Sequence, residues 1–130
     1  QENPVYKDAA AEVYDYLAGR VAACEKAGIA RARIAVDPGI GFGKTLDHNL
    51  DILNKLDRYR DLGGALVIGV SRKSFIAMID EKADTPAKRL GGSLAAALAG
   101  VARGASIIRV HDVYETRQAL EVWGAVNRGE

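Results

Sequence analysis

The chain has 130 residues, of which 48% are hydrophobic and 27% charged, and its formal net charge is +1. This length fits one hydrophobic core, so we expect residues 1–130 to form a single domain. The nearly neutral balance argues against nucleic-acid binding, which usually needs a clear basic excess. Cys24 is the only cysteine, which excludes an internal disulfide. With no long apolar run and no signal-peptide pattern, we expect no membrane association and a soluble, cytoplasmic protein.

The first half of the chain reads as helix, strand, helix. Asn3-Pro4 predicts a helix start, and Val13, Leu17 and Val21 recur at helical spacing until Gly28 ends the helix. Residues 34–36 form a short apolar strand. A second helix, closing near Gly63, is predicted from one apolar face, made of Leu46, Leu50, Leu53 and Leu56.

The second half repeats this alternation. Residues 65–70 read as a buried strand, residues 74–79 as a short helix, and residues 106–110 as a third strand. Between them, Thr85-Pro86 predicts the start of a helix rich in small residues, ending at Ala102. Asp112 and Glu115 resemble a capping box for a last helix. The predicted inner face of that helix consists of Leu120, Trp123 and Val126.

Strands that begin 30 to 40 residues apart, with helices between them, predict an α/β fold with a parallel sheet. Three parallel strands are few, because such sheets need their faces and edges covered. Three parallel strands with flanking helices therefore fit half of a (β/α)₈ barrel better than a complete open sheet.

The glycine-rich stretch of residues 36–49, "VDPGIGFGKTLDHN", resembles a phosphate-binding loop but has the wrong spacing. A P-loop would need its first glycine at the position of Pro38. The dinucleotide pattern fails too, since its last glycine would fall on Lys44 or Leu46. The distinctive residue is Asp37, at the end of the strand, whose simplest alternative role is to cap a turn.

Polar side chains lie at the end of each predicted strand: Asp37 after the first, Lys73 after the second, and Arg109 within the third, near its end, followed by His111. Ligands of parallel α/β folds bind at the carboxyl ends of strands, so we expect these groups to converge. A carboxylate suits paired N–H donors, a lysine suits a carbonyl or ring nitrogen, and an Arg–His pair suits phosphate. The residues thus point to a heterocycle that bears a phosphate.

Each of these residues also has a structural interpretation. Arg72 and Lys73 could be a solvated pair, and Arg72 could serve a structural ion pair. Arg109 is predicted to lie inside an apolar strand, where an unpaired charge is costly, which favours a functional role. His48 is predicted to be a surface residue or a helix-start contact, and Lys44 could reach solvent and have no role.

Three motifs, "DPGIGFGKT", "GVSRKSFI" and "IIRVHDV", in this order and at these intervals, resemble dihydropteroate synthase of the pterin-binding barrel family. The resemblance runs along the whole chain and implies the C-terminal half of a (β/α)₈ TIM barrel, starting after the fifth strand. It also implies a transferase that condenses 6-hydroxymethyl-7,8-dihydropterin diphosphate with p-aminobenzoate, giving 7,8-dihydropteroate and diphosphate in folate biosynthesis.

The same resemblance assigns roles to individual residues. Lys73, Arg109 and His111 would be catalytic, with Arg109 and His111 holding the diphosphate. The implied substrate contacts are the pterin edge at Asp37, the pterin face at Gly69 and Lys73, and p-aminobenzoate at Phe42, Lys73 and Ser74. Mg²⁺ is the implied cofactor, with its protein ligand outside this chain. Sulfonamide inhibitors and a homodimer are the further implied partners.

Two alternatives stay open. A pterin-dependent methyltransferase of the related barrel group would share the fold, but a methyl donor offers no diphosphate for the Arg109–His111 clamp. A non-catalytic half-barrel would be a structural module. In either form an isolated half-barrel is predicted to dimerise or to be poorly soluble, because its sheet edges are open.

Overall fold

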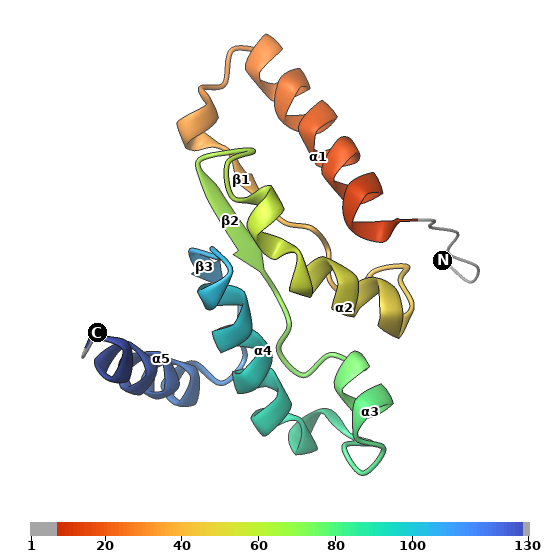
Figure 1. Cartoon of the computed structure of the whole chain (residues 1–130), viewed down its shortest axis with the longest axis vertical. Helices are drawn as coiled ribbons and strands as arrows, with labels where there is room; N and C mark the ends of the chain where they lie inside the picture. The colour runs from red at the N-terminus through yellow and green to blue at the C-terminus, as the bar shows by residue number, and fades with distance from the viewer. Residues whose placement is uncertain (1–7, 129–130) are drawn as a thin grey trace.

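The computed structural model describes residues 8–128 (Figure 1). Three short 3-10 helices, at Arg31–Arg33, Leu56–Tyr59 and Pro86–Lys88, lie in the connections. The α-helices are α1 (Ala9–Lys26), α2 (Leu46–Asn54), α3 (Phe75–Ile79), α4 (Leu90–Ala102) and α5 (Val113–Asn127), and the strands are β1 (Ala35–Val36), β2 (Ala65–Ile68) and β3 (Ile107–Ile108).

The three strands form one parallel sheet in the order β1-β2-β3. Ala35 pairs with Ala65 in the first ladder, and Val67 pairs with Ile107 in the second. Each connection between successive strands contains at least one helix. Helix α1 packs on α2, and α4 packs on α5. The predicted α/β class, with three parallel strands and flanking helices, is confirmed. None of the helices between residues 8 and 128 combines the length and apolar character needed to cross a bilayer.

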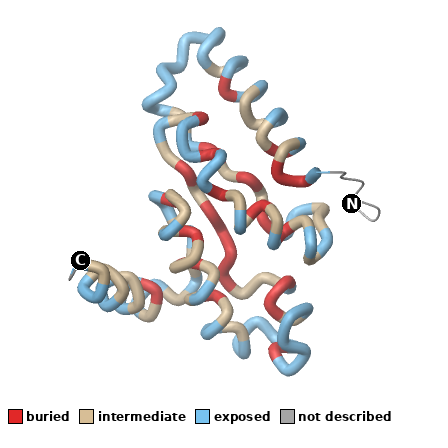
Figure 2. Tube along the Cα trace, viewed as in Figure 1, coloured by how far each residue is buried: buried red, intermediate tan, exposed pale blue. Residues whose placement is uncertain are grey.

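The core is centred on β2, which runs as a buried line through the middle of the molecule (Figure 2). Tyr59 is fully buried there, and its hydroxyl donates a 2.7 Å hydrogen bond to the carbonyl of Ala10. The Ala10 amide donates in turn to Asp51 at 3.1 Å, which ties the start of α1 to α2. The fully buried aliphatic side chains are Ile40, Ile52, Leu56, Leu66, Ile68 and Val70.

Helix α1 follows the predicted pattern, with Val13 and Val21 buried and Leu17 packed against the core. Its first residue is Ala9, because the side chain of Asp8 accepts a 3.1 Å hydrogen bond from the Ala11 amide as a helix cap. The predicted start signal, Asn3-Pro4, lies outside the described residues.

Most of the predicted leucine face is confirmed, since Leu46 and Leu53 pack against the core and Leu56 is fully buried, but one leucine departs from it. Leu50 is 39% exposed, whereas Asn49 and Ile52 are buried. The Asn49 side chain accepts a 2.8 Å hydrogen bond from the Gly41 amide, and this contact turns its face of the helix inward. The α-helix also ends at Asn54 rather than near Gly63, with a 3-10 turn continuing the chain.

The start of α2 confirms one proposed role of His48. The Thr45 hydroxyl accepts from the His48 amide at 3.3 Å, and the Thr45 amide donates to His48 Nδ1 at 3.2 Å. This reciprocal pair is a capping box, so His48 is a helix-start contact.

The later elements are shorter or shifted. Pro86 opens only a 3-10 turn, and α4 begins at Leu90, after Arg89. Strand β3 covers two residues of the predicted five. In α5, Thr116 is the buried residue and Val126 is 72% exposed, so the predicted inner face is only partly correct. Asp112 precedes α5 without a side-chain cap, because both of its carboxylate oxygens accept from another residue, Arg72.

Candidate active site

Asp37 joins the loops that follow β1 and β3. Its Oδ1 accepts a 2.8 Å hydrogen bond from the Gly39 amide, as in an Asx turn. Its Oδ2 accepts from Arg109 Nη1 at 3.2 Å. The carboxylate therefore caps a turn and also pairs with a cation from the far strand. The turn-capping interpretation is therefore correct, and the expected convergence of Asp37 with Arg109 is observed, while ligand binding by Asp37 stays a prediction.

The loop after Asp37 is held in shape from inside. Gly39, Gly41 and Gly43 have φ values of +73°, +91° and +61°, which residues with a Cβ rarely adopt. The ammonium group of Lys44 donates to the carbonyls of Gly39 at 2.7 Å and Phe42 at 2.9 Å. Lys44 is therefore a loop-closing residue, so the alternative that it has no role is wrong, although its side chain stays partly exposed. Burial lowers the pKa of its ammonium group, against the opposing effect of Asp37.

Lys73 enters the same loop from the end of β2. Its ammonium group donates to the carbonyl of Ile40 and lies 4.6 Å from the centre of the Phe42 ring. Desolvation by burial is the main cause of a lowered Lys73 pKa. Asp37 opposes that shift, while Arg109 adds to it. Phe42 is 68% exposed, so its ring forms an open wall beside the lysine.

The sequence predicted that Arg109 lies inside an apolar strand, and this prediction was wrong. Arg109 follows the last residue of β3, and its side chain is 59% exposed and paired with Asp37. The guanidinium lies against Gly69, where a Cβ atom would sit 2.5 Å from Nη2. The absence of a side chain at Gly69 therefore gives Arg109 the room to reach Asp37.

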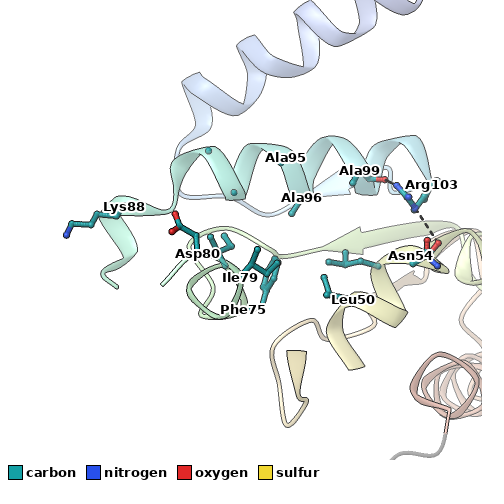
Figure 3. Close-up of a pocket in the computed structure, with 14 residues that line it drawn as sticks. Leu50, Asn54, Phe75, Ile79, Asp80, Lys88, Ala95, Ala96, Ala99 and Arg103 are labelled. Carbon is teal, nitrogen blue, oxygen red and sulfur yellow. Dashed lines mark hydrogen bonds between the residues drawn. The ribbon is translucent and has the colours of Figure 1, made fainter. Parts of the chain in front are cut away.

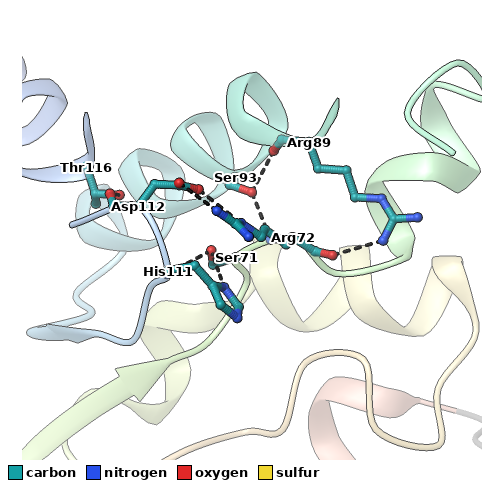
Figure 4. A network of polar contacts seen from close by, with 7 residues as sticks. All are labelled: Ser71, Arg72, Arg89, Ser93, His111, Asp112 and Thr116. Carbon is teal, nitrogen blue, oxygen red and sulfur yellow. Dashed lines mark hydrogen bonds and ion pairs between the residues drawn. The ribbon is translucent and has the colours of Figure 1, made fainter. Parts of the chain in front are cut away.

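His111 and Arg72 belong to a separate network of polar contacts (Figure 4). His111 Nδ1 lies 2.9 Å from the hydroxyl of Ser71, which also accepts from the His111 amide at 3.2 Å. Arg72 pairs with Asp112, confirming the structural ion pair considered from the sequence. Ser74 is exposed at the start of the five-residue helix α3.

The structure thus gathers five predicted residues into one cluster: Asp37 pairs with Arg109 beside Gly69, and Lys73 lies against Phe42 within electrostatic reach of Asp37 and Arg109. His111 and Ser74 lie on the same two loops as Arg109 and Lys73. The sequence reasoning missed the residues that hold this cluster, namely Lys44, Asn49, Ser71, Ser93 and Asp112. Their signal was weak, because small polar residues and a lysine after a glycine are common on surfaces.

Two concave regions differ in their relation to this cluster. A cavity of about 390 Å³ lies beside Asp37, between the glycine loop and the residues of α1 that include Tyr16. A larger groove of about 660 Å³ lies between α2, α3 and α4 (Figure 3). That groove is apolar, lined by residues such as Leu50, Phe75 and Ala96, and contains none of the seven predicted site residues.

Comparison with known proteins places the chain. Residues 1–111 match the pterin binding enzyme family. Over 127 residues the chain is 51% identical to dihydropteroate synthase of Neisseria meningitidis serogroup C, covering 97% of this chain and 44% of that protein.

Solved structures agree. The Xanthomonas albilineans dihydropteroate synthase in complex with 7,8-dihydropteroate superposes with a TM-score of 0.92 at 44% identity, covering 95% of this chain and 47% of that one. The same enzyme with 4-aminobenzoic acid gives a TM-score of 0.91 at 43% identity, covering 96% and 48%. The predicted partial TIM barrel is confirmed, and the chain spans about half the length of these relatives. The chain therefore belongs to the pterin-binding enzyme family, and the relatives it matches there are dihydropteroate synthases.

Proposed function

We propose that this chain supplies part of the active site of a dihydropteroate synthase, the transferase that joins 6-hydroxymethyl-7,8-dihydropterin diphosphate to p-aminobenzoate. The observation that carries the proposal is the gathering of Asp37, Lys73 and Arg109 from the loops that follow three neighbouring parallel strands: Asp37 pairs with Arg109, and the charges of both act on the ammonium group of Lys73. Relatives solved with 7,8-dihydropteroate and with 4-aminobenzoic acid support this choice of substrates. They also favour the synthase over the methyltransferase alternative.

For pterin binding, we propose that the carboxylate of Asp37 accepts the paired N–H groups of the amino-pyrimidine edge. One of its oxygens now accepts from Arg109, so the pterin would compete with that guanidinium. The Arg109 guanidinium covers the bare backbone of Gly69, so a flat ring bound there would displace that group or lie over it. Lys73 is half-buried at the same place and can donate to a ring carbonyl or nitrogen.

For p-aminobenzoate, we propose a position against the exposed ring of Phe42, with its carboxylate near the hydroxyl of Ser74. The carbon–oxygen bond to the diphosphate would break first and leave a pterin-methyl cation, which the amine nitrogen then attacks. The bonding electrons leave with the diphosphate, and the attacking amine loses a proton. Arg109 and His111 would stabilise the charge that develops on the departing anion.

Mg²⁺ belongs to the proposal as a cofactor that would offset charge on the diphosphate. Among residues 8–128, no three His, Cys, Asp or Glu side chains lie close enough to hold a metal ion. Asp37 is the carboxylate in the cluster, and both of its oxygens already accept hydrogen bonds. These residues do not fit a complete metal site, so its protein ligands are proposed to lie outside this chain.

The further partners also belong to the proposal. Sulfonamides would compete with p-aminobenzoate beside Phe42 and Lys73. A homodimer and a cytoplasmic location stay predictions, and the solution mass of the purified chain at rising concentration tests the first of them.

The decisive experiment measures p-aminobenzoate-dependent diphosphate release with Mg²⁺. It uses the chain alone and a chimera in which the chain replaces the matching part of the Neisseria meningitidis synthase. We expect turnover in the chimera, and its loss in Lys73→Ala. Lys88→Ala is the matched control, because Lys88 forms an exposed ion pair with Asp84. A chimera that folds and binds neither substrate would favour the structural half-barrel instead.

A further inference from the structure

The turn after β2 and the loop after β3 are joined by side chains beyond the end of the sheet (Figure 4). Val67 pairs with Ile107, forty residues later, in the parallel ladder. The same spacing continues where the backbone ladder has stopped. Ser71 binds His111 through its hydroxyl, and Arg72 binds Asp112 through its guanidinium. Side chains thus extend the register of the sheet into the loops that carry the candidate site.

The Arg72–Asp112 contact has the geometry of a two-point clamp. Arg72 Nε donates to one carboxylate oxygen at 3.2 Å and Nη2 donates to the other at 2.8 Å. Two parallel charge-assisted bonds fix orientation as well as distance, which one ammonium group cannot do. The side chains are 37% and 22% exposed, so solvent screens this pair less than it screens a fully exposed one.

The backbone of Arg72 is also held in an unusual shape. Its φ is +59°, the only positive value at a residue other than glycine among residues 8–128. Such a conformation persists only when the surroundings fix it. Its amide donates to the Ser93 hydroxyl at 2.8 Å, and its carbonyl accepts from Arg89 at 2.9 Å. The turn is therefore held from α4 on one side and from the loop before α5 on the other.

Lys73 follows directly on this fixed residue, so the φ and ψ of Arg72 set where its side chain leaves the turn. On the other loop, Asp112 follows His111 and stands three residues after Arg109. We propose that Arg72, Asp112 and Ser71 are positioning residues that lock the Lys73 turn to the Arg109–His111 loop, so that the two loops act as one rigid unit. The role in turnover rests on the proposed synthase function, whereas the mechanical coupling does not.

The first test measures the coupling between the two loops and does not depend on enzyme activity. Backbone amide shifts of the 130-residue protein are compared for wild type, Asp112→Asn and Arg72→Lys. We expect Asp112→Asn to move the amide signals of Lys73 and Ser74, which lie on the opposite loop. Arg117→Lys is the control, because Arg117 forms an exposed 3.2 Å ion pair with Glu121 on α5. Changes confined to the substituted loop would overturn the proposal.

The second test reads positioning in the chimera described above. Asp112→Asn and Arg72→Lys should each lower kcat by about tenfold to a hundredfold, since small misplacements of catalytic groups have effects of this size. The double variant should lose little more than the worse single variant, because both changes open the same clamp. Arg117→Lys should keep wild-type kcat.

A purely structural role makes a different prediction. It would lower the unfolding midpoint of both variants and leave kcat and KM per folded molecule unchanged, and that result contradicts the proposal. If the unsubstituted chimera binds substrates but shows no turnover, the synthase function fails. The amide shifts then still decide whether the two loops are coupled.

Discussion

The apolar centre of the sheet and the edge that carries the candidate site are built by different physical means. Around Ile68 the side chains are fully buried and touch one another, so shape and volume determine the structure. Around Asp37 the cluster is held by hydrogen bonds, an ion pair and a cation–ring contact, and Arg109 and Phe42 are largely exposed. A small substitution at the centre should therefore lower the free energy of unfolding, whereas a similar substitution at the edge should change the positions of the site side chains.

Gly100→Ala tests the packed centre and should have the largest effect on stability. A Cβ at Gly100 would lie 2.1 Å from Cδ1 of Ile68. We expect a loss of about 1–3 kcal/mol of unfolding free energy, measured by urea denaturation, because overpacking forces neighbours to shift.

Gly19→Ala is the matched control for that change, because Gly19 also lies within a helix and nothing stands within 4 Å of its added Cβ. It should gain about 0.5–1 kcal/mol from helix propensity alone. Ile68→Val removes the atom that clashes, so it should restore part of the stability in the Gly100→Ala background. If both glycine variants behaved alike, packing around Ile68 would not be the determining factor.

Tyr59→Phe tests a polar contact inside the centre. The change removes the hydroxyl that donates to the buried Ala10 carbonyl and leaves that carbonyl with its helical hydrogen bond alone. A loss of about 1–2 kcal/mol is expected, less than for the overpacked glycine. Hydrogen exchange should show faster opening at the start of α1, while the amides of α4 keep their protection. Uniform loss of protection would mean that the contact is not local to α1.

Acid pH tests the ion pairs at the margins of both regions. Lys55 lowers the pKa of Asp51 by hydrogen bonding, and Arg72 does the same for Asp112. Their folded pKa values lie below the unfolded value of about 4, so their stabilisation is complete above that pH and is lost as the pH falls through the folded values.

Urea unfolding at pH 6 and at pH 3 measures this loss. Asp51→Asn and Asp112→Asn should each reduce the difference between the two pH values. Asp84→Asn, in an exposed pair with Lys88, is the control. An undiminished acid effect in both variants would show that other carboxylates cause it.

Gly69→Ala should change stability least, by no more than about 0.5 kcal/mol, because its Cβ meets only the flexible and exposed end of Arg109. The displaced guanidinium should leave Asp37, and the Arg109 side-chain resonance should shift. Pterin diphosphate should then bind more weakly, as measured by calorimetry. A large loss of stability here would remove the distinction between the centre and the edge.

The positions of the strands were predictable from the sequence because apolar runs mark them, although β2 ends at Ile68 rather than at Val70. Asp37, Lys73 and Arg109 were placed correctly at neighbouring strand ends on that basis alone. The exposed surroundings of Arg109 were not predicted. The length of a strand depends on how many hydrogen bonds the neighbouring strand can form with it, and an apolar pattern does not give that number. Strand β3 ends at Ile108, although the apolar pattern continues to Val110.

The contacts that hold the site could not be predicted, since they depend on the choice between tertiary and local partners. Asp112 had the spacing of a helix cap, yet its carboxylate binds Arg72 from another loop. Asn49 was a polar residue beside a leucine face, yet it is buried because the Gly41 amide needs an acceptor. The glycines signalled a special loop, but not that Lys44 would close it.

The spacing of the strand pairs also bears on how the chain folds. Partners in the first ladder lie 30 residues apart, as with Ala35 and Ala65, and partners in the second lie 40 apart, as with Val67 and Ile107. The entropic cost of closing these two loops differs by only about 0.3 kcal/mol. The length of the connecting chain therefore does not determine which pair of strands forms first. The order of assembly must follow the packing that each crossover brings, and β2, which belongs to both pairs, is the strand on which folding would converge.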